Sequence, residues 1–374
     1  MKRLGCLLAI LLSLNVRIDS CATEAETEPG PPAAHKDQTF TEFFRRTSGW
    51  VAGDGALSVP LADGRVLWLF GDSHVDDFDP ASGTIPCLFQ TRNAALLHHT
   101  NEFRNARTLI GKEPGFRSWL KISGDGSNEW FWPLCGIQNG NSVWIYLSKQ
   151  RKVGAGGPWG FESTGHDYWA KIAFPEMDLI RYAALPDFKG ITFGHGLVKE
   201  GSYVYAFGSR RRGLASDTYV ERFKSDQPES DWRFWDGSNW GSAVARAVSI
   251  AQGKSTSVHV CKVKNKFLLT TSAFSVACDQ GKDIFMATSR YPTGPFSPLK
   301  KIFAIDDTFQ GHYPCFYFSV AHPEFINPQG ELLVTYSINN YEPCIKACVD
   351  GRAFPDHYRP KAIRVPLKLI DPDL

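Results

Sequence analysis

The chain has 374 residues, a formal net charge of +2 at pH 7, 43% hydrophobic residues and 21% charged residues. This balance is ordinary for a globular protein and leaves room for a sizeable core. The near-zero net charge gives no reason to expect nucleic acid or an acidic membrane as a partner. Apart from the N-terminus, no apolar run approaches the length needed to span a membrane.

The N-terminus has the plan of a secretory signal peptide. Lys2 and Arg3 precede an apolar run that ends at Leu14, so we expect residues 1–20 to be removed. Cys21 follows Ile-Asp-Ser, which is similar to a bacterial lipoprotein cleavage box with an atypical Asp. Either Cys21 is then lipidated, at the outer membrane or cell surface, or the protein is simply secreted. Residues 21–38 are expected to form a flexible tether, because they begin with a polar, acidic and Pro-rich stretch.

Seven cysteines remain beyond Cys6 and Cys21, and an odd number argues against a complete disulfide framework. Cys344 and Cys348 have three residues between them, but no matching Cys or His pair stands at zinc-site spacing. We therefore expect buried thiols with one or two disulfides and no structural zinc. The seven are Cys87, Cys135, Cys261, Cys278, Cys315, Cys344 and Cys348.

A β-hairpin is predicted between Trp50 and His74. Two apolar runs flank an Asp63-Gly64 pair, and Asp-Gly between strand-like runs is a strong hairpin signal. Asp54 precedes the first run and Asp72 follows the second, so antiparallel pairing brings these two acids together. Paired carboxylates at one rim of a β scaffold are what glycoside hydrolysis uses. Ordinary turn aspartates beside glycine are the alternative.

The same plan of strand, polar turn and aromatic-rich strand recurs along the chain, about every sixty residues after a longer first interval. Further strands lie between the copies, so each period has room for about four short strands. Such repeats predict an all-β fold, a single five-bladed β-propeller over residues 39–374. A β-sandwich or β-helix is the alternative, although a sandwich would not need five similar hairpins. The copies are residues 56–70, 134–147, 194–208, 257–271 and 321–337.

The first strand of each blade lines the central channel of a propeller, so equivalent polar positions should converge there. His322 and Glu324 are two residues apart and are expected to share one face of a strand. Each histidine alone is more often a structural residue, but their convergence favours a sugar-binding funnel. Besides Asp72, the converging residues are Asp54, Ser58, His195, Ser257, His259, His322 and Glu324.

Two motifs carry a resemblance to known proteins. The first is W-V-A-G-D-G-A-L-S-V-P-L-A-D-G-R-V-L-W-L-F-G-D-S, and the second is A-H-P-E-F-I-N-P-Q-G-E-L-L-V-T-Y-S-I-N-N. Together with S-R-Y-P-T-G-P-F at residues 289–296, they resemble the five-bladed propellers of domain-of-unknown-function families 5005 and 4185, relatives of glycoside hydrolase family 43. The resemblance covers residues 39–370.

The resemblance implies carbohydrate cleavage, with arabinan or another furanose-containing polysaccharide as a candidate substrate. It implies that Asp54 and Asp72 are the catalytic pair, with Asp54 at the general-base position of family 43. It also implies that His322 can help to hold a channel metal, often calcium, although no cofactor is required. Family 43 has its general-acid Glu on blade three, where this chain has His195 in G-H-G. The acid must therefore be Asp72 or Glu324, or the reaction is different.

The remaining candidates concern substrate binding. Trp50, Trp132 or Trp240 could stack on sugar faces, with a core position as the alternative. Arg92 and Asn93 could bind hydroxyls or a substrate acid, with solvated strand residues as the alternative. The substrate-binding candidates also include the three histidines of the funnel, His195, His259 and His322.

The sequence is compatible with two functions. The first is a secreted or lipid-anchored glycosidase, in which one carboxyl group protonates the leaving oxygen and the other activates water or attacks the anomeric carbon. The alternative is an inactive propeller that binds carbohydrate, which the missing blade-three acid favours; a lyase or phosphorylase is a weaker option. No G-x-S-x-G, H-E-x-x-H or P-loop motif points to another enzyme class. A monomer suffices for either function.

Overall fold

A computed structural model describes residues 32–374, except for positions 90, 101, 112–116, 123–127, 155–159 and 341–342. The predicted signal peptide, Cys21 and most of the predicted tether lie outside the described residues. Within the described part of the chain, no helix is both long and apolar enough to cross a membrane.

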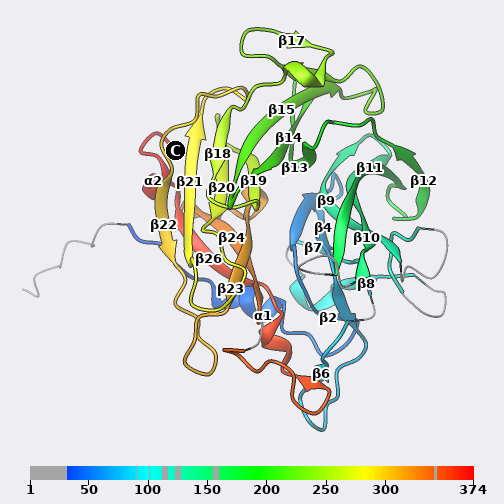
Figure 1. Cartoon of the computed structure of the whole chain (residues 1–374), viewed down its shortest axis with the longest axis vertical. Coiled ribbons are helices and arrows are strands. Elements are labelled where there is room, and N and C mark those ends of the chain that lie inside the picture. The colour runs from blue at the N-terminus through cyan, green and yellow to red at the C-terminus, as the bar shows by residue number, and fades with distance from the viewer. Residues whose placement is uncertain are drawn as a thin grey trace, which may run out of the picture. The chain divides into compact units, whose positions relative to one another are not determined.

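Five antiparallel sheets follow one another along the chain and form the blades of a β-propeller, which confirms the predicted fold (Figure 1). Blade 1 contains β3 (Leu57–Pro60), β4 (Arg65–Phe70), β7 (Ala94–His99) and β8 (Arg107–Leu109). Blade 2 contains β9 (Glu129–Asn139), β10 (Ser142–Lys152), β11 (Phe161–Ala173) and β12 (Leu179–Ala184). The first strand of each blade is its innermost strand, and the innermost strands of successive blades lie against one another.

The remaining blades follow the same order. Blade 3 contains β13 (Thr192–Glu200), β14 (Tyr203–Arg212), β15 (Ala215–Lys224), β16 (Arg233–Trp235) and β17 (Trp240–Gly241), with β18 (Ala251–Gly253) also pairing with β15. Blade 4 contains β19 (Val258–Val263), β20 (Lys266–Ser272), β21 (Asp283–Ser289) and β22 (Lys300–Ala304). Blade 5 contains β23 (Cys315–His322), β24 (Glu331–Asn339), β26 (Lys361–Pro366) and β1 (His35–Lys36).

The remaining elements are short. Two small two-stranded sheets pair β2 (Trp50–Gly53) with β5 (Ser73–Val75), and β6 (Ile85–Pro86) with β25 (Arg352–Ala353). Within the described residues, the α-helices are α1 (Gln38–Phe43) and α2 (Leu367–Ile370). Single 3₁₀ turns occur at Phe103–Asn105, Val244–Arg246, Pro323–Phe325 and Pro355–His357.

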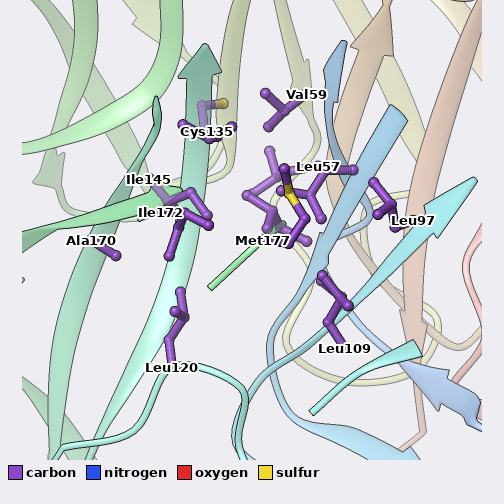
Figure 2. Packing of buried hydrophobic residues seen from close by; sticks show 14 of the residues in the cluster. Leu57, Val59, Leu97, Leu109, Leu120, Cys135, Ile145, Ala170, Ile172 and Met177 are labelled. Atoms are coloured by element: carbon purple, nitrogen blue, oxygen red, sulfur yellow. The ribbon is translucent and has the colours of Figure 1, made fainter. Parts of the chain in front are cut away.

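The first hairpin shows how the sequence forms a blade. Gly64 has φ +82°, a conformation that glycine adopts without steric cost, and the Asp63 carboxylate accepts a hydrogen bond from the Arg65 backbone N–H at 3.1 Å. Alternate residues of β3 and β4 then face opposite sides of the sheet. One side packs in the cluster between blades 1 and 2 that contains Leu57, Val59 and Ile145 (Figure 2).

Blade 5 is completed by the two ends of the described chain, because β1 pairs with β26. Asp37 then caps α1: one carboxylate oxygen accepts from the Phe40 N–H at 2.9 Å, and the other accepts from the Arg364 guanidinium at 2.6 Å. The tether predicted for residues 21–38 is therefore wrong at its C-terminal end. His35–Lys36 has a strand partner, and Asp37 has two hydrogen-bond partners.

The cysteines behave largely as predicted. Two disulfides join Cys87 to Cys348 and Cys278 to Cys344. The other three cysteines of the described chain are buried thiols, and these are Cys135, Cys261 and Cys315.

Candidate active site

The two aspartates of the first hairpin are brought together by strand pairing. β2 ends at Gly53 and β5 begins at Ser73, and these two residues are partners in the antiparallel register. Asp54 and Asp72 are the residues next to that pair. The Gly71 N–H donates to the Asp54 backbone carbonyl at 2.9 Å, and a Cβ atom on Gly71 would lie only 2.5 Å from an Asp54 carboxylate oxygen. The predicted proximity of the two acids is therefore confirmed, and glycine at position 71 is what permits it.

Asp54 is partly buried and faces two tyrosines. The Tyr317 hydroxyl, from the innermost strand of blade 5, donates to Asp54 Oδ2 at 2.8 Å. Tyr358 hydrogen-bonds to the same carboxyl group from the segment that precedes β26. Burial raises the pKa of Asp54 to about 6, although the two tyrosine hydrogen bonds oppose that rise.

Asp72 is buried and lies beside a cation. The Trp132 indole N–H donates to Asp72 Oδ1 at 3.2 Å, and the Arg92 guanidinium lies 3.4 Å from the same oxygen. Arg92 is itself held against aromatic rings, with its guanidinium carbon 3.9 Å from the centre of the Trp130 ring. Burial raises the pKa of Asp72 to about 7; the charge of Arg92 opposes this rise, and the charge of Asp54 adds to it.

Two neighbouring carboxyl groups with raised pKa values can share one proton near neutral pH. Asp72 has the higher pKa, so it holds that proton for more of the time. Asp54 ionises first, since its two tyrosine partners stabilise the charged form. One protonated and one ionised carboxyl group at the same site is the combination that general acid–base chemistry requires.

Three of the predicted substrate-binding residues have packing or hydrogen-bond partners within the fold. Trp50 is fully buried, stacks on Phe70 and donates its indole N–H to Ser73. Asn93 is also buried, and its amide bonds the backbone carbonyls of Leu120 and Phe131 and the Leu120 N–H. Trp240 packs on the outer strands of blade 3 against Trp235, Tyr205 and Arg222. Trp50 and Asn93 are thus enclosed by the fold, whereas Trp240 is partly exposed.

The funnel residues form a separate group inside the channel. His322 is fully buried, with Nδ1 2.6 Å from the Ser58 hydroxyl and Nε2 2.9 Å from the Thr335 hydroxyl. Glu324 lies in the 3₁₀ turn after β23 rather than on the strand with His322, and its Oε1 is 3.9 Å from His322 Nδ1. Glu324 also hydrogen-bonds to Ser58, and its contacts among the described residues do not include Asp54 or Asp72.

The channel histidines are neutral at physiological pH. Burial lowers the pKa of His195 to about 4, where the Ser209 hydroxyl lies 3.2 Å from its Nε2. Burial, with the nearby His195, lowers the pKa of His259 to about 3, and burial lowers that of His322 well below its usual value. A neutral imidazole is a very weak acid, so none of the three is poised to act as a general acid at that pH.

His322 does not fit the channel metal that the resemblance implied. Both of its ring nitrogens already lie within hydrogen-bond distance of hydroxyl groups. Calcium binds through several oxygen ligands, and the described residues contain no group of three His, Cys, Asp or Glu side chains arranged to hold a metal ion.

Sequence reasoning missed Tyr317 and Tyr358, and gave Trp132 only a stacking role. Trp132 instead reaches Asp72 through its N–H, while its ring packs edge-on against Phe161. Tyr317 lies just before the fifth hairpin motif, on the same strand. An alignment of the innermost strands that began a few residues earlier could have found it. Tyr358 lies in the long connection between β24 and β26, in which the sequence pattern singled out two cysteines but not this tyrosine.

The fold is that of a five-bladed β-propeller. Residues 37–367 match the domain of unknown function DUF5005, and the chain belongs to that family, as its motifs predicted. No curated protein sequence matches it.

Three solved structures illustrate the similarity in fold. A candidate hydrolase from Bacteroides ovatus ATCC 8483 superimposes with a TM-score of 0.70 at 18% identity, over 91% of this chain and 92% of that one. An α-L-arabinofuranosidase from Podospora anserina has a TM-score of 0.46 at 10% identity, over 90% and 95% of the two chains. An endo-arabinase from Bacteroides thetaiotaomicron VPI-5482 has a TM-score of 0.47 at 13% identity, over 87% and 99%.

Proposed function

We propose that this protein is an exported glycoside hydrolase that cleaves a polysaccharide, with arabinan or another furanose-containing glycan as the first candidate substrate. The observation that carries the proposal is the Asp54–Asp72 pair, two adjacent carboxyl groups whose pKa values burial raises to about 6 and about 7. Packing alone does not require two such groups at the rim of a blade. The resemblance of the protein's sequence motifs to those of propeller glycosidases guides the choice of glycans to test.

In this proposal the two acids have different roles. Asp72 holds the proton near neutral pH and donates it to the leaving glycosidic oxygen. Asp54, ionised and held by Tyr317 and Tyr358, activates water or attacks the anomeric carbon. Arg92 keeps Asp72 oriented, and its guanidinium can bind sugar hydroxyls or a substrate acid.

Export is part of the proposal. The two disulfides suit an oxidising compartment outside the cytoplasm, which agrees with the predicted signal peptide. Lipidation of Cys21 would hold the enzyme at the cell envelope, whereas ordinary secretion would release it. One chain supplies all the groups of the site, so a monomer is the working unit we propose.

The test is a screen of polysaccharides and aryl glycosides with the wild type, Asp54→Asn and Asp72→Asn. We expect release of reducing sugar from an arabinan or related glycan, lowered in each variant by roughly a hundred-fold to ten-thousand-fold. Asp63→Asn is the matched control, because Asp63 lies in the turn of the same hairpin and should leave the rate unchanged. Hydrolysis that survives in both site variants would contradict the assignment.

A second candidate function is glycan binding without cleavage. The observation that favours it is the neutral His195 at the blade where family 43 has its acid. Binding of a glycan by the wild type, with no cleavage and with unchanged affinity in both aspartate variants, would establish this function instead.

A further inference from the structure

The two longest connections between second and third strands lie in neighbouring blades 1 and 5. In blade 1, residues 71–93 join β4 to β7, and in blade 5 a connection joins β24 to β26. We call residues 343–360 of the second connection the strap. The first connection carries Asp72 and Arg92, and the strap carries Tyr358, so both contribute to the candidate active site.

A short strand pairing and a disulfide join the middle of the strap to the blade 1 connection. β25 of the strap pairs with β6, and the Arg352 guanidinium donates to the hydroxyl and carbonyl oxygens of Thr84 at 2.9 Å each. Next to this pairing, Cys87 forms its disulfide with Cys348, and the Cys87 N–H donates to the Gly351 carbonyl at 3.1 Å. A disulfide thus closes the junction between the two connections.

On the blade 1 side, this junction lies directly beside the site. Phe89 is two residues after Cys87, and its ring stacks on Tyr358 with 6.4 Å between ring centres. The same ring lies 5.2 Å from the Arg92 guanidinium carbon. Phe89 therefore joins the tyrosine that holds Asp54 to the arginine that holds Asp72.

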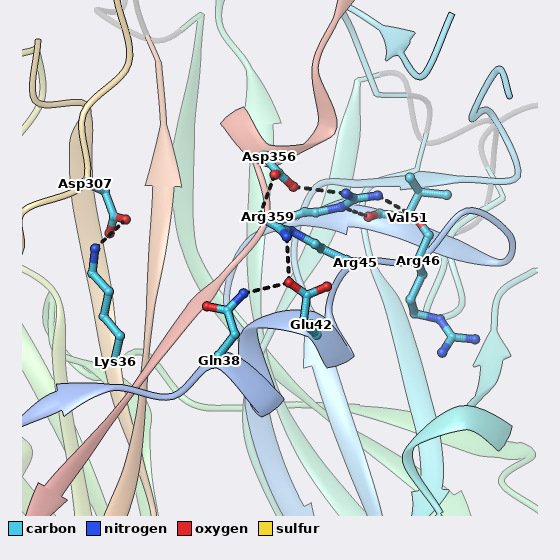
Figure 3. A network of polar contacts seen from close by, with 9 residues as sticks. All are labelled: Lys36, Gln38, Glu42, Arg45, Arg46, Val51, Asp307, Asp356 and Arg359. Carbon is cyan, nitrogen blue, oxygen red and sulfur yellow. Dashed lines mark hydrogen bonds and ion pairs between the residues drawn. The ribbon is translucent and has the colours of Figure 1, made fainter. Parts of the chain in front are cut away.

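On the strap side, the backbone continues into contacts with β2. The Gly53 N–H donates to the Tyr358 carbonyl at 2.9 Å. Arg359, which is buried, donates to the Val51 carbonyl at 2.8 Å and to the Arg46 carbonyl at 2.5 Å (Figure 3). These bonds hold the end of the strap, whereas the disulfide holds its middle.

We propose that the Cys87–Cys348 disulfide is a positioning device of the candidate active site, which holds Tyr358 on Asp54 and Phe89 beside Arg92. The site is then fully assembled only in the oxidised protein. The inference rests on the proposed function for the catalytic role of Asp54, but the positioning itself does not depend on any activity.

The physical reason is the weakness of the junction without its covalent bond. A pair of two-residue strands is only marginally stable in water, and the disulfide removes much of the entropy that the two connections would otherwise regain. A mobile strap would present the Tyr358 hydroxyl to Asp54 for only part of the time. Since that hydrogen bond favours the ionised carboxyl group, its loss raises the pKa of Asp54.

The experiment measures the ionisation of Asp54 directly. Carbodiimide and glycine ethyl ester modify protonated carboxyl groups, and peptide mass spectrometry reads the extent at each pH. The ionisable groups that face Asp54 are Tyr317, Tyr358 and Asp72, with Arg92 beyond Asp72. We compare the wild type with the double variant Cys87→Ala/Cys348→Ala and with Tyr358→Phe. The matched control is Cys278→Ala/Cys344→Ala, which frees the same strap from blade 4 but leaves the junction closed.

We expect the labelling midpoint of Asp54 to rise by about half to one pH unit in Tyr358→Phe, the equivalent of one hydrogen bond. The Cys87/Cys348 variant should show a rise in the same direction, and the Cys278/Cys344 variant should show none. An unchanged midpoint in a folded Cys87/Cys348 variant, with a shift in Tyr358→Phe, would overturn the proposal, because the Arg359 contacts would then suffice.

A second measurement tests the proposal in case the Cys87→Ala/Cys348→Ala variant does not fold. Native wild-type protein is treated with a phosphine reductant, alkylated, and sorted by the disulfide that has opened. Opening of Cys87–Cys348 should increase hydrogen exchange in peptides that cover residues 349–358 and raise the Asp54 midpoint; unchanged exchange and midpoint would contradict the proposal. Neither measurement uses a substrate. Failure of the positioning proposal can therefore be distinguished from failure of the proposed glycosidase function.

Discussion

Asp54 and Asp72 differ in the partners that face them, and this difference underlies the roles that we propose for them. Asp54 accepts hydrogen bonds from two neutral phenols, whereas Asp72 has a neutral indole and a cation beside it. Asp72 nevertheless has the higher pKa, because it is the more deeply buried and the charge of Asp54 acts on it. The burial of Asp72 therefore outweighs the effect of Arg92.

The first prediction is a bell-shaped pH dependence of hydrolysis. The rate should fall as the pH drops through the pKa of Asp54, about 6, because the base becomes protonated. It should also fall as the pH rises through the pKa of Asp72, about 7, because the acid loses its proton. The two limbs belong to the coupled pair, and kcat/KM measured from pH 4 to 9 gives both. A single rising limb through this range would contradict the assignment.

The second prediction concerns Arg92→Gln. Removing the cation should raise the pKa of Asp72 further, so the alkaline limb of the pH profile moves to higher pH. The same midpoint can be read by carbodiimide labelling of Asp72. Arg210→Gln is the matched control, because Arg210 also stacks on an aromatic ring, that of Tyr219, on blade 3. An alkaline limb that moves to lower pH in Arg92→Gln would show that the guanidinium does not act on Asp72 in this way.

At the scale of elements, the N-terminal segment stabilises blade 5. A chain that starts at residue 39 lacks β1 and the Asp37 cap, so it should unfold at a temperature several degrees below that of a chain that starts at residue 32. The cap contributes about 1 kcal/mol, and the hydrogen bond from Arg364 to the carboxylate contributes about 1.5–3 kcal/mol. Thermal unfolding by circular dichroism measures the difference.

Asp37→Asn separates these two contributions. Asparagine is as good an N-cap as aspartate, so this variant should lose only the charged contact with Arg364, whereas Asp37→Ala should lose both. Equal unfolding temperatures for the chains that start at residues 32 and 39 would show that β1 and Asp37 do not stabilise the blade.

A second element-scale prediction concerns the last turn, where α2 is followed by Asp371. The buried Lys266 ammonium donates to Asp371 at 2.7 Å and the Thr288 hydroxyl donates at 2.6 Å. Burial alone would raise the pKa of Asp371, but these hydrogen bonds outweigh it and lower the pKa to about 2. Asp371→Asn should therefore lower the free energy of unfolding at pH 7 by about 1.5–3 kcal/mol. Urea titration measures this change.

The same pair predicts a pH dependence of stability. The folded-state pKa of Asp371 lies below its ordinary value of 3.8, so its contribution is present above about pH 4 and is lost as the pH falls towards 2. The difference between wild type and Asp371→Asn should shrink over that range. Asp373→Asn is the control, because that side chain is 66% exposed and should change stability by less than about 0.5 kcal/mol.

An element could be predicted from its local sequence pattern where only one local structure fits that pattern. Asp63-Gly64 between two apolar runs predicted a hairpin, and β3 and β4 confirm it. The proximity of Asp54 and Asp72 followed from the same antiparallel pairing. The direction of a side chain was less predictable, because Trp50 and Asn93 flank the site in sequence but point into the core. The Glu324 prediction was wrong about the strand because the chain turns at Pro323.

Tyr358, which reaches the site from a distant part of the chain, could not be predicted. Tyr358 is held on Asp54 by a disulfide, a strand pairing and the contacts of Arg359, none of which leaves a periodic signal. The cysteines indicated only that some cross-links existed. Their pairing depends on how blades 4, 5 and 1 are arranged, and that arrangement is set by tertiary packing.

At the scale of the whole molecule, the two disulfides differ in the length of chain that they close. Cys87 and Cys348 are 261 residues apart in sequence, and Cys278 and Cys344 are 66 apart. Chain-entropy arguments give the longer loop a stabilisation larger by about 1 kcal/mol. Cys87→Ala/Cys348→Ala should therefore lower the unfolding midpoint more than Cys278→Ala/Cys344→Ala. Denaturant titration of the two variants measures this order, and the reverse order would contradict the entropic account.

The pairing of β1 with β26 has a consequence for the order in which the ring can form. β1 is among the first described residues to be synthesised, and its partner is among the last. Blades 1 to 4 can each form from contiguous chain, but the fifth must wait for both ends. During synthesis, the early strand has an open edge and the nascent ring has a gap. Closure is thus the final, long-range step, of the kind that folds slowly, and it converts a row of separate sheets into one cooperative body.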